Sequence, residues 1–153
     1  MVVYVINKYG KPLMPYSPRK ARILLKTGKA KVIKRTPFTI KLLYGSGQAK
    51  QPLIHGVDTG SDKIGSAVVN DKEEVVYMSE ITIRNDITKT MKQRASARRN
   101  RRNRKTRYRK ARWANRKNSR KKDRFSPTMI SKFNSHLKEI NFVKSILPIT
   151  KLI

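Results

Sequence analysis

The feature that most constrains this chain is a stretch of 36 residues, 87–122, that contains no aspartate or glutamate. From Lys89 to Arg120 it also contains no proline or glycine, and arginine, lysine and alanine are good helix formers. The composition predicts an arginine-rich helix over 87–122, of about 30 residues and roughly 45 Å. Like charges at i and i+4 repel one another, and no continuous apolar stripe interrupts them. Such a helix needs a polyanion around it.

The composition of the whole chain indicates which kind of polyanion this is. The chain has 38 lysines and arginines against 9 acidic residues, a formal net charge of +29. Nucleic acid is the obvious large polyanion. An anionic membrane surface is the rival, but the sequence has no long helix with a broad apolar face and no run of 18 apolar residues. Cysteine is absent, which excludes disulfides and cysteine zinc sites and fits a cytoplasmic protein.

The side chains of the basic stretch suit phosphate and base contacts. Arginine pairs bidentately with phosphate, and tyrosine or tryptophan offers a surface on which bases stack. A disordered basic tail of the ribosomal-protein type is the alternative, although this stretch lies between two patterned segments. The predicted nucleic-acid-binding residues are Arg94, Arg98, Arg99, Arg101, Arg102, Arg104, Lys105, Arg107, Tyr108, Arg109, Arg112, Trp113 and Arg116.

Residues 1–45 are predicted to form a small β-α-β-β module. Val2–Ile6 is rich in strand formers, and the two prolines of Pro12–Pro15 make that segment stiff and extended. Ser17-Pro18 is a good helix start, and Gly28 is placed to follow the helix end. Two further strands, 31–34 and 38–44, complete the module, and 46–52 is a linker.

The remaining segments predict an α+β fold. Residues 53–86 contain three strand-like runs, Leu53–Asp58, Ile64–Val69 and Glu74–Ile83, which predict an antiparallel meander that opens a larger mixed sheet. In 123–153, Ser126-Pro127 starts a second helix, and the run Ile146–Ile153 resembles the beginning of a buried strand. An end inside such a strand leads us to expect that the sheet is completed elsewhere. The apolar stripe expected on this helix is Ile130, Phe133, Leu137 and Ile140.

Asp58 is the candidate catalytic and metal-binding residue. It ends a predicted strand beside the turn Thr59-Gly60-Ser61, and such a carboxylate can hold Mg²⁺ near a phosphate. Ribonuclease-H-like nucleases and actin-like ATPases both open in this way, and a plain turn capped by Asp58 is equally compatible. We expect His55 to pack on the opposite face of its strand and His136 to lie on the surface.

Three motifs, in this order, resemble the IscB and IsrB family of transposon-encoded RNA-guided nucleases. They are Lys11-Pro12-Leu13-Met14-Pro15, Asp58-x-Gly60-Ser61, and the pattern Arg98-Arg99-x-Arg101-Arg102 continued by Arg107-Tyr108-Arg109-x-x-Arg112-Trp113. In the family these correspond to a PLMP domain, the first RuvC segment and the arginine-rich bridge helix. The resemblance covers nearly the whole chain.

The resemblance implies a ribonuclease-H-type RuvC fold in which Asp58 is the first of several Mg²⁺ ligands. It also implies that the bridge helix holds a structured guide RNA and the RNA–DNA heteroduplex through backbone contacts, because base pairing reads the sequence in such systems. RNA contact by the PLMP module is implied as well. The later RuvC segments and any HNH domain are absent from the sequence. Cleavage of DNA is therefore expected to need a second polypeptide that supplies the missing strands.

Two other functions remain open at this point. A stand-alone basic RNA-binding or ribosome-associated protein would bind bulk RNA and would not need Asp58. An actin-like ATPase fragment would bind nucleotide, but the arginine-rich stretch has no role there.

Overall fold

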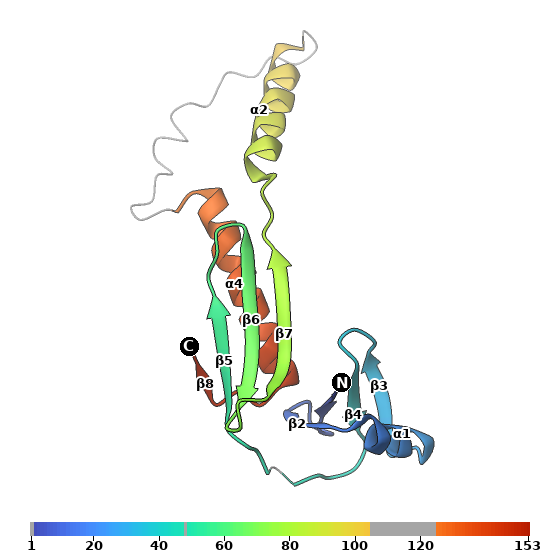
Figure 1. Ribbon diagram of the computed structural model, residues 1–153. Helices are drawn as coiled ribbons and strands as arrows, with labels where there is room; N and C mark the ends of the chain where they lie inside the picture. The colour runs from blue at the N-terminus through green and yellow to red at the C-terminus, as the bar shows by residue number, and fades with distance from the viewer. Residues whose placement is uncertain (1, 48, 105–124) are drawn as a thin grey trace. The chain divides into compact units, whose positions relative to one another are not determined.

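The computed structural model describes residues 2–47, 49–104 and 125–153, and it is a mixed α+β fold (Figure 1). The chain divides into two units. One comprises Met1–Thr82 with His136–Ile153, and the other comprises Ile83–Ser135. Two mixed four-stranded sheets lie in the first unit, and three helices are described in all. None of the described helices is long and apolar enough to cross a membrane.

The N-terminal sheet has the strand order β2-β1-β4-β3, with β1 parallel to β4 and the other neighbours antiparallel. Val5, Ile40 and Leu42 are fully buried in its core, and the helix packs Ala21 and Leu24 against them. The elements are β1 (Val3–Ile6), β2 (Pro12–Tyr16), α1 (Pro18–Lys26), β3 (Ala30–Lys34) and β4 (Thr39–Leu42).

The predicted β-α-β-β order of this module was wrong by one strand. The extended segment Pro12–Tyr16 is β2, which pairs antiparallel with β1. Its prolines are tolerated because β2 is the edge strand of the sheet, where a missing N–H need not break a ladder. The ends of α1 are confirmed: Ser17 Oγ accepts a hydrogen bond from Lys20 N at 3.4 Å, and Gly28 has a φ of 68°.

The second sheet confirms the predicted meander. Three antiparallel strands follow one another in the chain, and β8 lies parallel to β5 on its other side, which gives the order β7-β6-β5-β8. The buried strand expected over 146–153 is limited to the two exposed residues of β8, since the preceding helix continues to Ile146. The strands are β5 (Leu53–Asp58), β6 (Lys63–Asn70), β7 (Val75–Thr82) and β8 (Lys151–Leu152).

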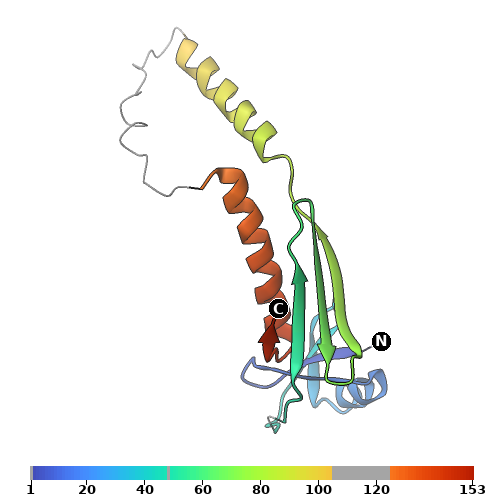
Figure 2. The ribbon, with the colours of Figure 1, turned by 60° about the vertical axis from the view of Figure 1, so that its left-hand side comes forward.

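Helix α4 (Pro127–Ile146) begins at the predicted Ser126-Pro127, and Ser126 Oγ accepts from Met129 N at 3.3 Å. Its C-terminal part covers one face of the second sheet (Figure 2). The predicted apolar stripe was wrong: Ile130, Phe133 and Leu137 are exposed, and Ile140 is half-buried. Only the last turns of α4 reach the sheet, so the buried residues are instead Glu139, Val143 and Ile146.

Candidate nucleic-acid interface

Helix α2 (Ile87–Asn103) carries the described part of the arginine-rich stretch. It starts where the helix was predicted, but it ends at Asn103 because Arg104 has an extended backbone, with φ −68° and ψ 127°. The helix predicted over 87–122 is therefore described as a helix over Ile87–Asn103 only, and residues 105–124 lie outside the described residues. Arg94, Arg98, Arg99, Arg101, Arg102 and Arg104 are described. The remaining predicted binding residues, Lys105, Arg107, Tyr108, Arg109, Arg112, Trp113 and Arg116, lie outside the described residues.

The start of α2 holds the last described acid before the arginines. Asp86 is the N-cap residue, and both of its carboxylate oxygens accept hydrogen bonds from the guanidinium of Arg84. The hydrogen bond from Arg84 lowers the pKa of Asp86. Its backbone oxygen accepts from Thr90 N at 2.9 Å. Asp86 is thus already engaged within its own turn, and α2 itself contains seven lysines and arginines and no acid.

No residue of α2 is buried, and residues 91–101 are all exposed. Successive residues are about 100° apart around a helix, so Arg94, Arg98 and Arg101 lie on one face within an arc of about 60°. Arg101 Nε donates to the backbone oxygen of Ala97 at 3.4 Å, and the guanidinium has four further N–H donors. Such a face presents guanidinium forks to a ligand and has nothing apolar to bury against protein.

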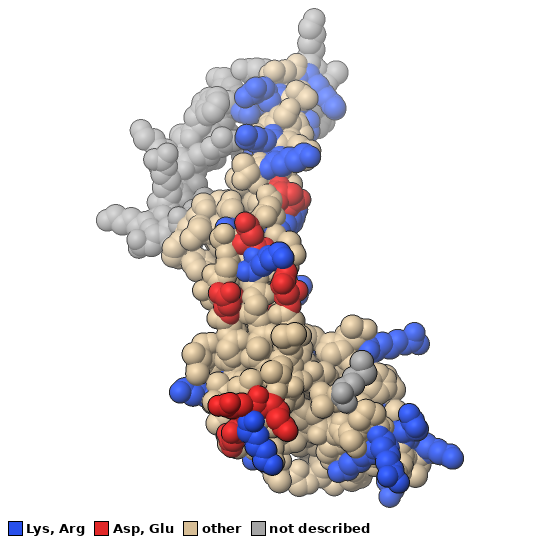
Figure 3. Space-filling view, viewed as in Figure 1, with Lys and Arg blue, Asp and Glu red and all other residues tan. Residues whose placement is uncertain are grey.

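The charge of the chain is concentrated over particular elements (Figure 3). In this view lysine and arginine gather over α2 and over the N-terminal sheet with α1, while the acidic side chains lie over the second sheet and its connections. The repulsion between cations at i and i+4, such as Arg94 and Arg98, is relieved when phosphates neutralise them.

Asp58, the predicted metal-binding and catalytic residue, lies at the end of β5 and is exposed. It is paired across the ladder with Gly65, which in turn is paired with Glu80 of β7. A Cβ added to Gly65 would lie 3.4 Å from Asp58 Cβ, so the glycine keeps the space beside the carboxylate open. Asp58, Gly65 and Glu80 line an open cavity of about 890 Å³ on the sheet face opposite α4.

The described residues do not form a complete Mg²⁺ site around Asp58. No group of three or more histidine or acidic side chains that could hold a metal occurs among the described residues. Glu80, two strands away, forms an ion pair with Lys63 at 2.6 Å, and this hydrogen bond raises the pKa of Lys63. Adjacent strands are about 4.8 Å apart, so Asp58 and Glu80 are separated by roughly 10 Å at their Cα atoms. One free carboxylate does not satisfy an ion that demands near-octahedral oxygen coordination.

A buried polar cluster on the other face of the sheet was not predicted. Glu139 of α4 accepts hydrogen bonds from Tyr77 Oη at 2.8 Å and from Ser79 Oγ at 2.7 Å. Burial raises the pKa of Tyr77 to about 12. The sequence did contain a signal that pointed to this residue, because Glu139 is the only acidic residue in 125–153.

His55 lies on this buried face, as predicted. It is fully buried, and its Nε2 is 2.8 Å from Ser66 Oγ. Burial lowers the pKa of His55, the charge of Glu139 opposes that shift, and Lys144 adds to it. His55 therefore belongs to the packing of the sheet and lies on the opposite side from Asp58. His136, expected on the surface, is half-buried.

Comparison with known proteins gives a family match over nearly the whole chain. The sequence model of a family described as RRXRR protein matches residues 3–153. The matched range includes both sheets, the Arg98–Arg102 pattern and α4. No curated protein matches the chain.

Proposed function

The chain belongs to the RRXRR protein family, as the resemblance to IscB-like proteins predicted, and on this basis we propose that it binds a structured guide RNA through its arginine-rich segment. The observation that carries the proposal is α2: a helix with seven cations, no acid and no buried residue. A helix of this kind contacts phosphates and leaves the reading of bases to pairing between nucleic-acid strands.

The same proposal assigns the second sheet to the opening part of a RuvC fold of ribonuclease-H type. Three consecutive antiparallel strands followed by a helix and a fourth strand parallel to the first support this assignment. Asp58, exposed at the end of the first of these strands, is proposed to supply one Mg²⁺ ligand. Further carboxylates have to come from outside the described residues, and a second polypeptide is one proposed source. The RNA–DNA heteroduplex is then the proposed second ligand of the arginine-rich segment.

The test is to identify the RNA that accompanies the protein. We would express the chain in its own host, purify it at moderate salt and sequence the RNA bound to it. One discrete structured RNA, enriched far above its abundance and lost when Arg94, Arg98, Arg99 and Arg101 are changed to glutamine, is the expected result. A profile that matches bulk ribosomal and messenger RNA would replace this proposal with a generic RNA-binding function.

The Asp58→Asn variant separates binding from chemistry in the same experiment. Asp58 lies on a different unit from α2, so this variant should retain the same RNA. If the Asp58→Asn protein loses the RNA while remaining folded, the assignment of RNA binding to the arginine-rich segment is wrong.

A further inference from the structure

A second basic surface lies in the first 45 residues, which contain 11 lysines and arginines and no acidic residue. Residues 46–83 reverse this balance, with 3 basic and 6 acidic side chains. The cations of the N-terminal module are largely exposed, as on α1, where Arg19, Lys20 and Arg22 all face solvent. A module without any internal counter-charge is suited to a polyanion in its own right.

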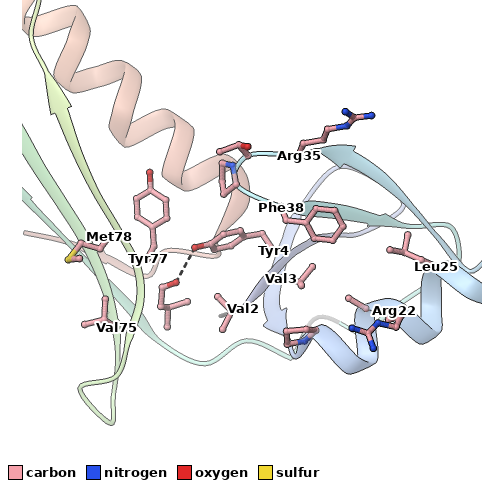
Figure 4. Close-up of a pocket in the computed structure, with 15 residues that line it drawn as sticks. Val2, Val3, Tyr4, Arg22, Leu25, Arg35, Phe38, Val75, Tyr77 and Met78 are labelled. Atoms are coloured by element: carbon pink, nitrogen blue, oxygen red, sulfur yellow. Dashed lines mark hydrogen bonds between the residues drawn. The ribbon is translucent and has the colours of Figure 1, made fainter.

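An apolar cleft opens between this module and β7 of the second sheet, both of which belong to the same unit (Figure 4). Its volume is about 940 Å³, at the upper end of the range for small-molecule sites, roughly 300–1,000 Å³. Tyr4 fixes one side of it: its hydroxyl donates to the backbone oxygen of Val76 at 3.1 Å, and its ring meets that of Tyr77 edge to face. A hydrogen bond and a ring contact therefore join the two sheets at one side of the cleft.

The chemistry of the lining is apolar with a cationic rim. Phe38 is 38% exposed, and Met78 on the opposite wall is 79% exposed. Arg22 and Arg35 are the only charged residues among those that line the cleft, and neither forms an ion pair with the described residues. Figure 4 shows the Arg35 guanidinium extending away from the other labelled side chains, with Val3 and Phe38 drawn between Tyr4 and Leu25.

We propose that this cleft receives an unstacked nucleotide of single-stranded RNA, with the base against Phe38 and the flanking phosphates on Arg22 and Arg35. A base has apolar faces that aromatic and aliphatic side chains cover, and its phosphates require cations at the entrance. A second copy of this chain, at a net charge of +29, is repelled by the same rim. The inference rests on the proposed RNA-binding function. It adds a site for single-stranded RNA, in the cleft, to the proposed duplex-binding surface of α2.

The experiment measures the affinity of the purified full chain for two labelled probes, a short oligouridine and an RNA duplex, by fluorescence anisotropy. Phe38→Ala is compared with Tyr9→Ala, an exposed aromatic of the same module outside the cleft. Arg22→Ala is compared with Arg19→Ala, an exposed cation of the same helix outside the lining. Loss of one base–aromatic stack weakens binding by about 5- to 150-fold. We expect that loss for oligouridine in Phe38→Ala, a smaller loss in Arg22→Ala, recovery in Phe38→Tyr, and unchanged duplex binding.

Equal effects in the cleft variants and their controls would overturn the proposal, since binding would then follow charge alone. If Phe38→Ala retains its affinity for oligouridine, the proposal is also overturned. An apolar protein segment would then be the alternative occupant of the cleft. If Phe38→Ala fails to fold, as judged by circular dichroism, the comparison of Arg22→Ala with Arg19→Ala decides the question. The variant of α2 with four arginines changed to glutamine separates the two proposals. If duplex affinity is unchanged in this variant, the proposed function is contradicted. The comparison of oligouridine affinity between Phe38→Ala and Tyr9→Ala still tests the cleft.

Discussion

Removing charge from α2 should change the salt dependence of RNA binding without changing the stability of the protein. The perturbation is the simultaneous replacement of Arg94, Arg98, Arg99 and Arg101 by glutamine. All four side chains are exposed, and α2 contains no buried residue, so no packing is lost. Glutamine is also a good helix former, and the change removes repulsion between like charges at i and i+4.

The magnitude follows from counterion release. Each phosphate contact contributes about 0.7 to 0.9 to the slope of log affinity against log salt, depending on whether the nucleic acid is single- or double-stranded. If each of the four arginines neutralises one phosphate, the slope should fall by about 3 to 4. The contribution of these contacts to the change in affinity between about 50 and 200 mM salt is then roughly 50- to 150-fold.

The assay is a titration of labelled duplex RNA at several KCl concentrations, followed by anisotropy. A matched control removes four exposed cations elsewhere, at Lys50, Lys72, Lys138 and Lys151. Its net charge changes by the same amount. The reasoning is refuted if the control lowers the slope as much as the α2 variant does, because binding would then depend on diffuse charge and not on the helix.

Three further predictions concern the folded core. Glu139→Ala should lower the free energy of unfolding by about 2–4 kcal/mol in urea titrations, because it leaves the buried Tyr77 hydroxyl and a neighbouring serine without their acceptor; an unchanged midpoint would contradict the buried contact. The pKa of His55 is lowered in the folded protein, so its contribution to stability should be complete above the unfolded value of about 6.5 and be lost as pH falls through the folded value. The thermal midpoint of a His55→Asn variant should therefore depend less on pH between 5 and 7 than that of the unmodified chain, and parallel curves would count against the mechanism. Gly60→Ala should destabilise the chain by about 1–3 kcal/mol, since the added Cβ would lie 2.1 Å from a backbone oxygen of the same turn, whereas Gly65→Ala at 3.4 Å should cost less; the same urea titrations compare the two.

The features that the sequence predicted correctly are those set by local chemistry. Ser17-Pro18 and Gly28 fix the ends of α1 because a cap and a positive φ depend on a few neighbouring residues. The meander was predictable because alternation of side chains places Leu53 and His55 on one face and Asp58 on the other. The boundaries of these strands agree within two residues.

The features that the sequence did not predict depend on tertiary neighbours. Pro12–Tyr16 became a strand only because β1 offers an edge beside it. On α4 the hydrophobic spacing selected Phe133 and Leu137, but the sheet reaches only the last turns, where Glu139 is buried by two hydroxyl donors. Local pattern carries no information about where a sheet ends in space, so the wrong face was chosen.

Stability and the proposed nucleic-acid binding therefore belong to different side chains, and this separation can be measured. The Glu139 cluster lies in one unit, α2 lies in the other, and α2 buries nothing. Independent sites add within about 0.3–0.5 kcal/mol. Combining Glu139→Ala with the four-arginine variant should change the free energy of unfolding by the sum of the two separate changes. An interaction energy above about 1 kcal/mol would mean that α2 stabilises the folded core. The arginine face would then not be wholly available to RNA.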